Sequence, residues 1–212
     1  LHLSSVLADA GADAALVITP SFYKSAMNAD ALKAHYTKVA DQCSIPTILY
    51  NVPAITGVEL SADLAIEMAA HPNCIGIKDS GGDIAKITRM VAETRELDFQ
   101  VLCGSAGFLL PGLQVGSVGG VCAAANCLGH ELVQLYEECI KNGCSKKALD
   151  LQARLVAPNA VVTRGFGVAG LKYALDRMGY YGGPLRSPLQ PLTDAQKAGV
   201  ARAFAKSGFT FK

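Results

Sequence analysis

Residues 74–83 read Cys-Ile-Gly-Ile-Lys-Asp-Ser-Gly-Gly-Asp, and this stretch decides the fold. An apolar run of strand length ends at Lys78 and is followed by a turn rich in glycine. Asp83 stands where a helix N-cap is wanted, and apolar residues recur at helical spacing from Ile84 onward. The stretch therefore predicts a strand, a turn and a helix, which together make one βα unit.

The same unit recurs on both sides of this stretch. Short apolar runs alternate with longer stretches of helical period, a pattern typical of a parallel sheet built from βα units. The predicted strands are residues 14–19, 46–50, 74–78, 99–104 and 118–123. Beyond residue 128 only helical patterns follow, and a capping box of Thr193 and Gln196 opens the last of them. The sequence thus predicts an α/β fold with a helical tail.

Two architectures contain such a sheet, an open doubly wound sheet and a closed barrel. No dinucleotide-binding glycine motif follows a predicted strand, whereas Tyr50, Lys78 and Gly104 each end one, where barrel enzymes carry their active sites. We therefore predict a (β/α)8 TIM barrel with C-terminal helices. Because five strands cannot close a ring of eight, we expect the N-terminal three βα units to be lacking. Residues 1–128 would hold strands 4–8 with their helices, and residues 129–212 the C-terminal helices packed on the same domain.

The composition argues against several kinds of partner. Lys and Arg number 19 against 18 Asp and Glu, so little net charge is present to attract nucleic acid. No run of eighteen apolar residues predicts a membrane-spanning helix. The seven cysteines are an odd number without a Cys-x-x-Cys pair, and no His cluster completes a metal site. We expect no nucleic-acid partner, no membrane partner, no metal and no cofactor.

Lys78 is the residue with the most direct chemical potential. If the strand directs its side chain into the barrel, burial disfavours the ammonium form, and the neutral amine can attack a ketone. The resulting iminium accepts the electron pair released when a neighbouring C–C bond breaks. The alternative is a lysine at a strand end that simply reaches solvent, which is the commoner case.

Other candidate residues lie in the loops after the same strands. Tyr50 could relay protons through its phenol, or could be a rim aromatic that satisfies a buried edge. Ser80 offers a hydroxyl beside backbone N–H groups near a helix start, an arrangement suited to a substrate carboxylate. Gly104 and Ser105 could likewise bind substrate, because glycine allows close approach of a ligand. Each loop could also be an ordinary turn between a strand and a helix.

Two motifs resemble the dihydrodipicolinate synthase and N-acetylneuraminate lyase superfamily. They are Tyr50-Asn51-Val52-Pro53-x-x-Thr56-Gly57 and Gly76-Ile77-Lys78-Asp79-Ser80. Within that superfamily, residues 78–83, 99–109, 158–160 and 179–184 look most like the animal 4-hydroxy-2-oxoglutarate aldolases.

The resemblance implies a homotetramer without metal that cleaves 4-hydroxy-2-oxoglutarate to pyruvate and glyoxylate. It makes Lys78 the Schiff-base lysine and Tyr50 the tyrosine that handles protons, with Ser80 and Gly104 at positions that line the site. It also implies a mitochondrial location, since the animal enzyme is mitochondrial.

Three departures from the superfamily's patterns bear on the substrate. Ile55 stands where the synthases carry an arginine that holds a carboxylate, and it cannot form that bidentate pair. Ala106 and Gly107 stand near the place where sialic acid lyases carry acidic residues, which disfavours a long polyol substrate. Phe22 occupies a position where many members have a tyrosine that reaches a neighbouring subunit. The alternatives are another pyruvate-dependent lyase of the family, acting on a 2-keto-3-deoxy acid or as a synthase, and a non-catalytic barrel subunit.

Overall fold

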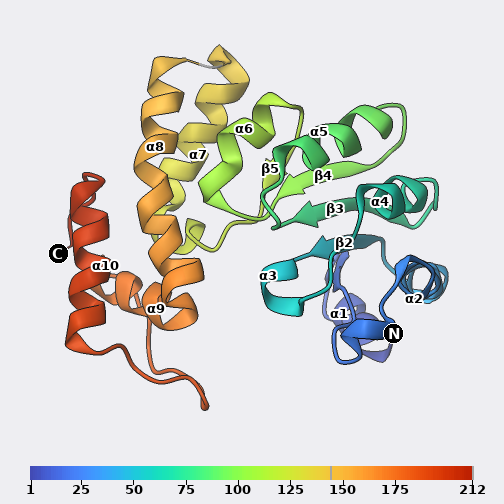
Figure 1. Ribbon diagram of the computed structural model, residues 1–212, viewed down its shortest axis with the longest axis horizontal. Coiled ribbons are helices and arrows are strands. Elements are labelled where there is room, and N and C mark those ends of the chain that lie inside the picture. Colours follow the sequence, from blue (N-terminus) through green and yellow to red (C-terminus); the bar gives the residue numbers. More distant parts are fainter. Residues whose placement is uncertain (144, 212) are drawn as a thin grey trace. The chain divides into compact units, whose positions relative to one another are not determined.

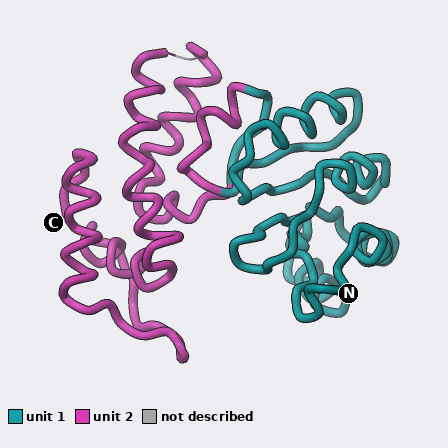
Figure 2. Tube along the Cα trace, viewed as in Figure 1, with its two compact units in different colours: residues 1–104, 115–120 teal, residues 105–114, 121–212 magenta. Residues whose placement is uncertain are grey.

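The computed structural model describes residues 1–143 and 145–211. The chain forms two compact units (Figure 2). Unit 1 comprises residues 1–104 and 115–120, and unit 2 comprises residues 105–114 and 121–212. The predicted boundary at residue 128, between the barrel strands with their helices and the C-terminal helices, stays a prediction.

Unit 1 is built on a parallel sheet of five strands in the order β1-β2-β3-β4-β5 (Figure 1). Every neighbouring pair is parallel. The strands are β1 (Ala15–Ile18), β2 (Thr47–Asn51), β3 (Cys74–Asp79), β4 (Gln100–Cys103) and β5 (Gly119–Gly120). The predicted parallel α/β sheet is confirmed, with every predicted strand present in its expected order.

Strand β5 is much shorter than the predicted run of residues 118–123. Only Gly119 and Gly120 pair with β4, and the flanking Val118 and Val121 are about half exposed. In the described part of the chain β5 pairs with β4 alone, so only one neighbouring strand supplies it with backbone hydrogen bonds. The apolar run at residues 118–123 therefore predicted a longer strand than the structure contains. Its two glycines offer no side chain to pack on the sheet.

One helix precedes the first strand of unit 1, and the others follow its strands. They are α1 (His2–Asp9), α2 (Ala29–Gln42), α3 (Pro53–Thr56), α4 (Ala62–Met68) and α5 (Ile84–Glu93), with the 3-10 turn η1 (Lys24–Ala26) before α2. Helix α2 packs against α4, and α4 packs against α5. On α2, Leu32 and Tyr36 recur at helical spacing and are both buried. The Tyr36 hydroxyl also donates to the Val17 carbonyl oxygen at 3.3 Å, which joins α2 to β1.

The helix starts of unit 1 are set by local side-chain chemistry. The Ser61 hydroxyl accepts a hydrogen bond from the backbone N–H of Leu64, and the Asp83 carboxylate accepts one from that of Lys86. Asp83 was predicted as an N-cap, and each of the two residues satisfies a donor that the first helical turn leaves open. The cap at Asp83 fixes the point at which the chain leaves the loop after Lys78.

Unit 2 is helical. It contains η2 (Ala106–Phe108), α6 (Leu109–Gln114), α7 (Ala125–Asn142), α8 (Lys146–Ala160), the π-helical turn η3 (Val161–Gly165), α9 (Gly167–Arg177) and α10 (Asp194–Lys206). The predicted capping box at the start of α10 is confirmed, with Thr193 and Gln196 bonding each other's backbone N–H groups. No helix in the described ranges is long and apolar enough to cross a membrane.

Helix α8 was not predicted, although it packs against α7 and α10. Pro158 lies inside it, and a proline normally marks the end of a helical pattern. A signal was nevertheless present, because Ala148, Leu151 and Leu155 recur at helical spacing and all three are buried. Ser145 caps this helix by accepting from the backbone N–H of Ala148.

Candidate active site

The register of β2 and β3 places Tyr50 directly opposite Lys78. Because side chains alternate between the two faces of a strand, these two residues point to the same face of the sheet. The Lys78 Nζ lies 4.0 Å from the centroid of the Tyr50 ring, within the range of a cation–π interaction. The sequence marked both residues separately, and the structure brings them into contact.

Lys78 is buried, with 8% of its surface exposed. Within residues 1–143 and 145–211 it forms no ion pair, so its amine is not held by a carboxylate there. Its register partner on β4 is Leu102, and Ile18 of β1 pairs with Tyr50. A lysine in this position has an aromatic and an aliphatic neighbour on its own face of the sheet.

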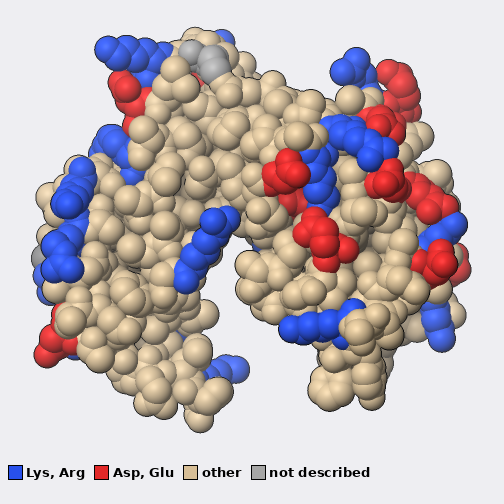
Figure 3. Space-filling model, viewed as in Figure 1, with Lys and Arg blue, Asp and Glu red and all other residues tan. Residues whose placement is uncertain are grey.

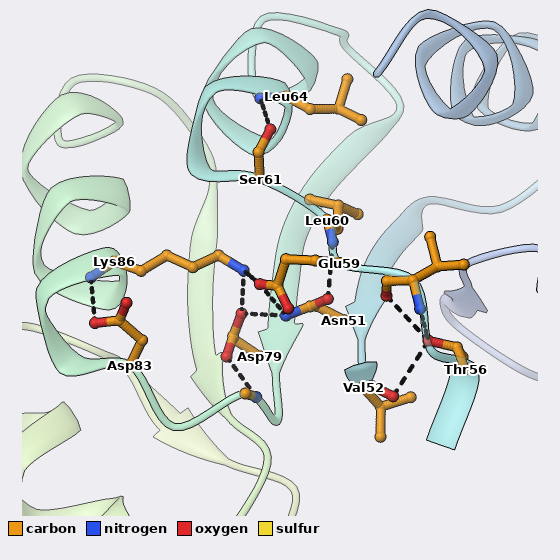
Figure 4. Close-up of polar contacts among 12 residues, drawn as sticks. Asn51, Val52, Thr56, Glu59, Leu60, Ser61, Leu64, Asp79, Asp83 and Lys86 are labelled. Atoms are coloured by element: carbon orange, nitrogen blue, oxygen red, sulfur yellow. Dashed lines mark hydrogen bonds and ion pairs between the residues drawn. The ribbon is translucent and has the colours of Figure 1, made fainter. Parts of the chain in front are cut away.

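The opposite face of the same strand ends carries a polar network (Figure 4). Asn51 and Asp79, the residues after Tyr50 and Lys78, are fully buried and opposite each other in register. The Asn51 Nδ2 donates to the Asp79 Oδ2 at 2.8 Å, and the Gly81 N–H donates to the Asp79 Oδ1 at 2.8 Å. The network therefore joins β2 to β3 at the point where the two candidate residues stand.

Lys86 and Glu59 complete the network. The Lys86 Nζ lies 3.0 Å from the Asp79 Oδ2 and also forms an ion pair with Glu59. The Asn51 Nδ2 donates to the Glu59 Oε1 at 3.1 Å, while the Leu60 N–H donates to the Asn51 Oδ1 at 3.0 Å. A buried carboxylate is costly unless it is paired and hydrogen-bonded, and both conditions are met at Asp79.

Charged side chains of both signs also gather on the surface of unit 1 around α4 and α5 (Figure 3). Arg89, for example, lies 2.5 Å from Asp63 and 2.7 Å from Glu93. These groups are largely exposed, and pairs of this kind contribute little to stability. The buried ion pair at Asp79 is different in kind from this surface charge.

Ser80 and Gly104 also lie together at the strand ends. The Ser80 hydroxyl contacts the Gly104 carbonyl oxygen at 3.5 Å, and the Gly104 N–H donates to the Asp79 carbonyl at 2.7 Å. A Cβ at position 104 would collide with the Ser80 side chain and lie 2.9 Å from the Asp79 carbonyl oxygen. Only glycine fits there, so the two neighbouring loops can approach each other closely.

Ser105 is the first residue of unit 2. Its hydroxyl oxygen accepts from the Asn159 Nδ2 at 3.0 Å and from the Gly107 N–H at 3.3 Å. Asn159 is buried, and its Oδ1 has no hydrogen-bond partner among the described residues. The sequence analysis gave Asn159 no role. Its contact with Ser105 could not be predicted from local patterns, because 54 residues separate the two.

Cys103 at the end of β4 is not a competing nucleophile. It pairs in register with Asp79 and is fully buried. Burial raises the pKa of the Cys103 thiol, and the nearby Asp79 carboxylate acts in the same direction although a hydrogen bond with Ser117 opposes it. The thiol is therefore protonated at neutral pH, and a thiol is a weak nucleophile.

Two of the three departures from the superfamily patterns, at Ile55 and Phe22, lie at the surface of unit 1, whereas Ala106 is buried in unit 2. Ile55, on the short helix α3, is 76% exposed. Phe22 is 89% and Tyr23 71% exposed, and their rings form an edge-to-face pair with centroids 5.0 Å apart.

Residues 1–207 match the sequence profile of the dihydrodipicolinate synthetase family. The chain belongs to this family. It is similar to a 4-hydroxy-tetrahydrodipicolinate synthase of Methanoculleus marisnigri, at 36% identity over 208 residues that cover 98% of this chain and 70% of that protein. It is also similar to an uncharacterised DapA-like lyase of Halobacterium salinarum, at 36% identity over 98% of this chain and 65% of the relative.

Solved structures of the family show the same fold. A dihydrodipicolinate synthase from Thermotoga maritima matches with a TM-score of 0.89 and 26% identity, covering 98% of this chain and 70% of that one. A chloride-inhibited synthase from Acinetobacter baumannii in complex with pyruvate also gives a TM-score of 0.89, with 28% identity and the same coverage of both chains. The parallel sheet and its helices therefore belong to a TIM barrel of this family, as predicted.

The relatives correct one expectation and leave another unsupported. The expected mitochondrial location is wrong, because it rested on the animal enzyme, whereas the similar proteins described above come from archaea, which have no mitochondria. These relatives are members of the predicted superfamily, and the chain is accordingly a lyase of that family. They do not support a particular specificity for 4-hydroxy-2-oxoglutarate.

Proposed function

We propose that the protein is a class I lyase in which Lys78 forms a Schiff base with a small 2-oxo acid, with pyruvate as the common partner. The observation that carries the proposal is the buried Lys78 amine 4.0 Å from the Tyr50 ring, at the end of a barrel strand. Membership of the family supports it, as does the pyruvate complex of a solved relative.

In the proposed reaction, the neutral Lys78 amine attacks the C2 carbonyl of the 2-oxo acid, and loss of water gives an iminium. In the cleavage direction, the C3–C4 bond breaks and its electron pair moves to the iminium nitrogen as an enamine forms. The hydroxyl at C4 loses its proton and becomes the carbonyl of the leaving aldehyde. A proton then returns to C3, and water hydrolyses the imine to release pyruvate and the free amine.

Tyr50 has the position required for these proton transfers. Its ring contacts the Lys78 amine, so its phenol belongs to the immediate surroundings of any adduct formed there. We propose that Tyr50 donates and accepts the protons of the carbinolamine and of the C4 hydroxyl. Ser80, Gly104 and Ser105 are proposed to bind the substrate, with the two serine hydroxyl groups as donors to a carboxylate and Gly104 allowing its close approach.

Two reactions of a pyruvate Schiff base are compatible with this site, an aldol cleavage and a condensation. Ile55 lacks the guanidinium that holds the semialdehyde carboxylate in the synthases, which supports aldol cleavage of 4-hydroxy-2-oxoglutarate to pyruvate and glyoxylate. The names of the archaeal relatives support the alternative, condensation of pyruvate with an amino semialdehyde to a dihydrodipicolinate precursor. Assays of both reactions with the same preparation separate them, because glyoxylate appears only in the first.

We also propose a homotetramer. The exposed Phe22–Tyr23 pair supports it, because two large aromatic rings at 89% and 71% exposure suit burial against another subunit. Analytical ultracentrifugation would test this, with Phe22→Ser expected to shift the protein toward smaller species.

The experiment that tests the chemistry is borohydride reduction in the presence of pyruvate, followed by mass mapping of the labelled peptide. We expect one adduct, at Lys78, and none in Lys78→Ala. The absence of an adduct at saturating pyruvate would contradict the mechanism and support the non-catalytic subunit instead.

A further inference from the structure

We propose that Asn51 and Asp79 are positioning residues, which hold the Tyr50 ring against the Lys78 amine through a network on the opposite face of the sheet. The role in reaction rate rests on the proposed function of Lys78. The positioning itself does not, because it concerns the arrangement of Tyr50 and Lys78 in the free protein.

The placement of the four residues is the first argument. Tyr50 with Asn51, and Lys78 with Asp79, are consecutive residues on neighbouring strands, so each pair presents its two side chains to opposite faces. Hydrogen bonds that hold the side chain of Asn51 or Asp79 in place therefore also restrain the backbone from which Tyr50 or Lys78 projects. Asn51 and Asp79 act through that backbone and do not contact the proposed reacting atoms.

The completeness of the hydrogen bonding is the second argument. Both oxygens of Asp79 are used, one by the Gly81 N–H and the other by Asn51 and Lys86. Both polar atoms of the Asn51 side chain are used as well, the oxygen by the Leu60 N–H and the nitrogen by Asp79 and Glu59. A network whose members are all satisfied makes its region rigid and specifies one arrangement.

The position of the network along the strands is the third argument. It lies at the last register pair of β2 and β3, where the backbone ladder ends, apart from the Ser80 N–H that donates to the Asn51 carbonyl at 2.8 Å. Strand ends are the part of a sheet most able to separate. A misplacement of about 1 Å in reacting groups can cost roughly a hundredfold in rate. A cross-strand side-chain bond at this pair limits such movement.

A spectroscopic test needs no substrate. With lysine labelled by 13C at the ε carbon, the Lys78 methylene signal should be shifted upfield by the ring current of Tyr50, and Lys78→Ala identifies it by its loss. We expect Asn51→Ala and Asp79→Asn to move this signal toward the position of an ordinary lysine. Asp63→Asn is the matched control, because it removes a carboxylate that pairs with Arg89 at the surface of the same unit.

A kinetic test follows from the same variants. At saturating pyruvate, the rate of borohydride trapping per folded molecule should fall roughly tenfold to a hundredfold in Asn51→Ala, with little change in the pyruvate concentration for half saturation. The double variant N51D/D79N reverses donor and acceptor across the strands and should recover part of the rate. Asn51→Ala leaves Asp79 bonded to Gly81 and Lys86, so it serves as the deciding variant if Asp79→Asn does not fold.

The outcomes separate the two proposals. If the wild-type protein is not trapped by pyruvate, the Schiff-base function fails, while the NMR signal still tests the positioning. If folded Asn51→Ala keeps both the upfield signal and the wild-type trapping rate, the network serves stability alone and the inference is overturned.

Discussion

The Tyr50 side chain makes two separable contributions at the residue scale, its ring and its hydroxyl. Tyr50→Phe keeps the ring beside the Lys78 amine and removes only the group proposed to move protons. We expect the imine with pyruvate to form still, but more slowly, while the turnover number falls by about 10²–10⁴-fold, the usual contribution of a positioned acid or base. Steady-state kinetics combined with borohydride trapping would check this. An unchanged turnover number would remove Tyr50 from the mechanism.

Gly104 gives a second prediction at this scale. Gly104→Ala would place a methyl group into the Ser80 side chain and 2.9 Å from the Asp79 carbonyl oxygen. We expect the free energy of unfolding to fall by about 1–3 kcal/mol, as for other overpacked sites. Urea denaturation measures it. Gly129→Ala is the control, since a Cβ there meets nothing within 4 Å and alanine should be neutral or slightly stabilising in helix α7.

At the scale of elements, the N-cap of α5 links the loop after Lys78 to its helix. Asp83→Ala removes the acceptor for the Lys86 N–H, and we expect a loss of about 1 kcal/mol in the free energy of unfolding. Asp83→Asn should retain most of the stability, because asparagine caps about as well. Chemical denaturation of the two variants gives the comparison, and equal losses in both would mean that the charge matters rather than the cap.

The elements that the sequence predicted are those whose signals are local. The strand predicted at residues 74–78 and the cap at Asp83 each depend on residues within a few positions, and both are confirmed, with the strand extending one residue further to Asp79. Helix α8 was missed although its signal is also local, at Ala148, Leu151 and Leu155. Strand β5 was overestimated because its length depends on pairing with β4.

The candidate site shows the same division. Tyr50 and Lys78 could be marked because each ends a strand, and their alternation with Asn51 and Asp79 was visible in the sequence. The network on the opposite face was not predictable. Its closing contacts come from Glu59 and Lys86, and the contact between these two spans 27 positions of the chain. Such contacts are set by how α5 packs on the sheet rather than by any local pattern.

At the scale of the whole molecule, buried thiols make stability depend on alkaline pH. Burial raises the pKa of Cys127 from its ordinary value of 9.0 to about 11. Between these pH values the unfolded chain loses the thiol proton while the folded protein keeps it. The stabilisation is therefore complete below about pH 9 and is lost as the pH rises to about 11.

We therefore expect the free energy of unfolding to fall more steeply between pH 9 and 11 in the wild-type protein than in Cys127→Ala. The difference accumulated over this interval should be about 2–3 kcal/mol, from two pH units at 1.36 kcal/mol each. Denaturation midpoints measured across the interval for both proteins test it. Parallel slopes would show that Cys127 ionises alike in the folded and unfolded states.

The alternation of Tyr50 with Asn51 and of Lys78 with Asp79 also constrains how this sequence can evolve. Inserting or deleting one residue in β2 or β3 would exchange the two faces, placing an amide or a carboxylate where the phenol or the amine now stands. No single substitution elsewhere could restore the arrangement. Descendants of this gene should therefore keep the lengths of these two strands unchanged and confine insertions and deletions to the loops between elements.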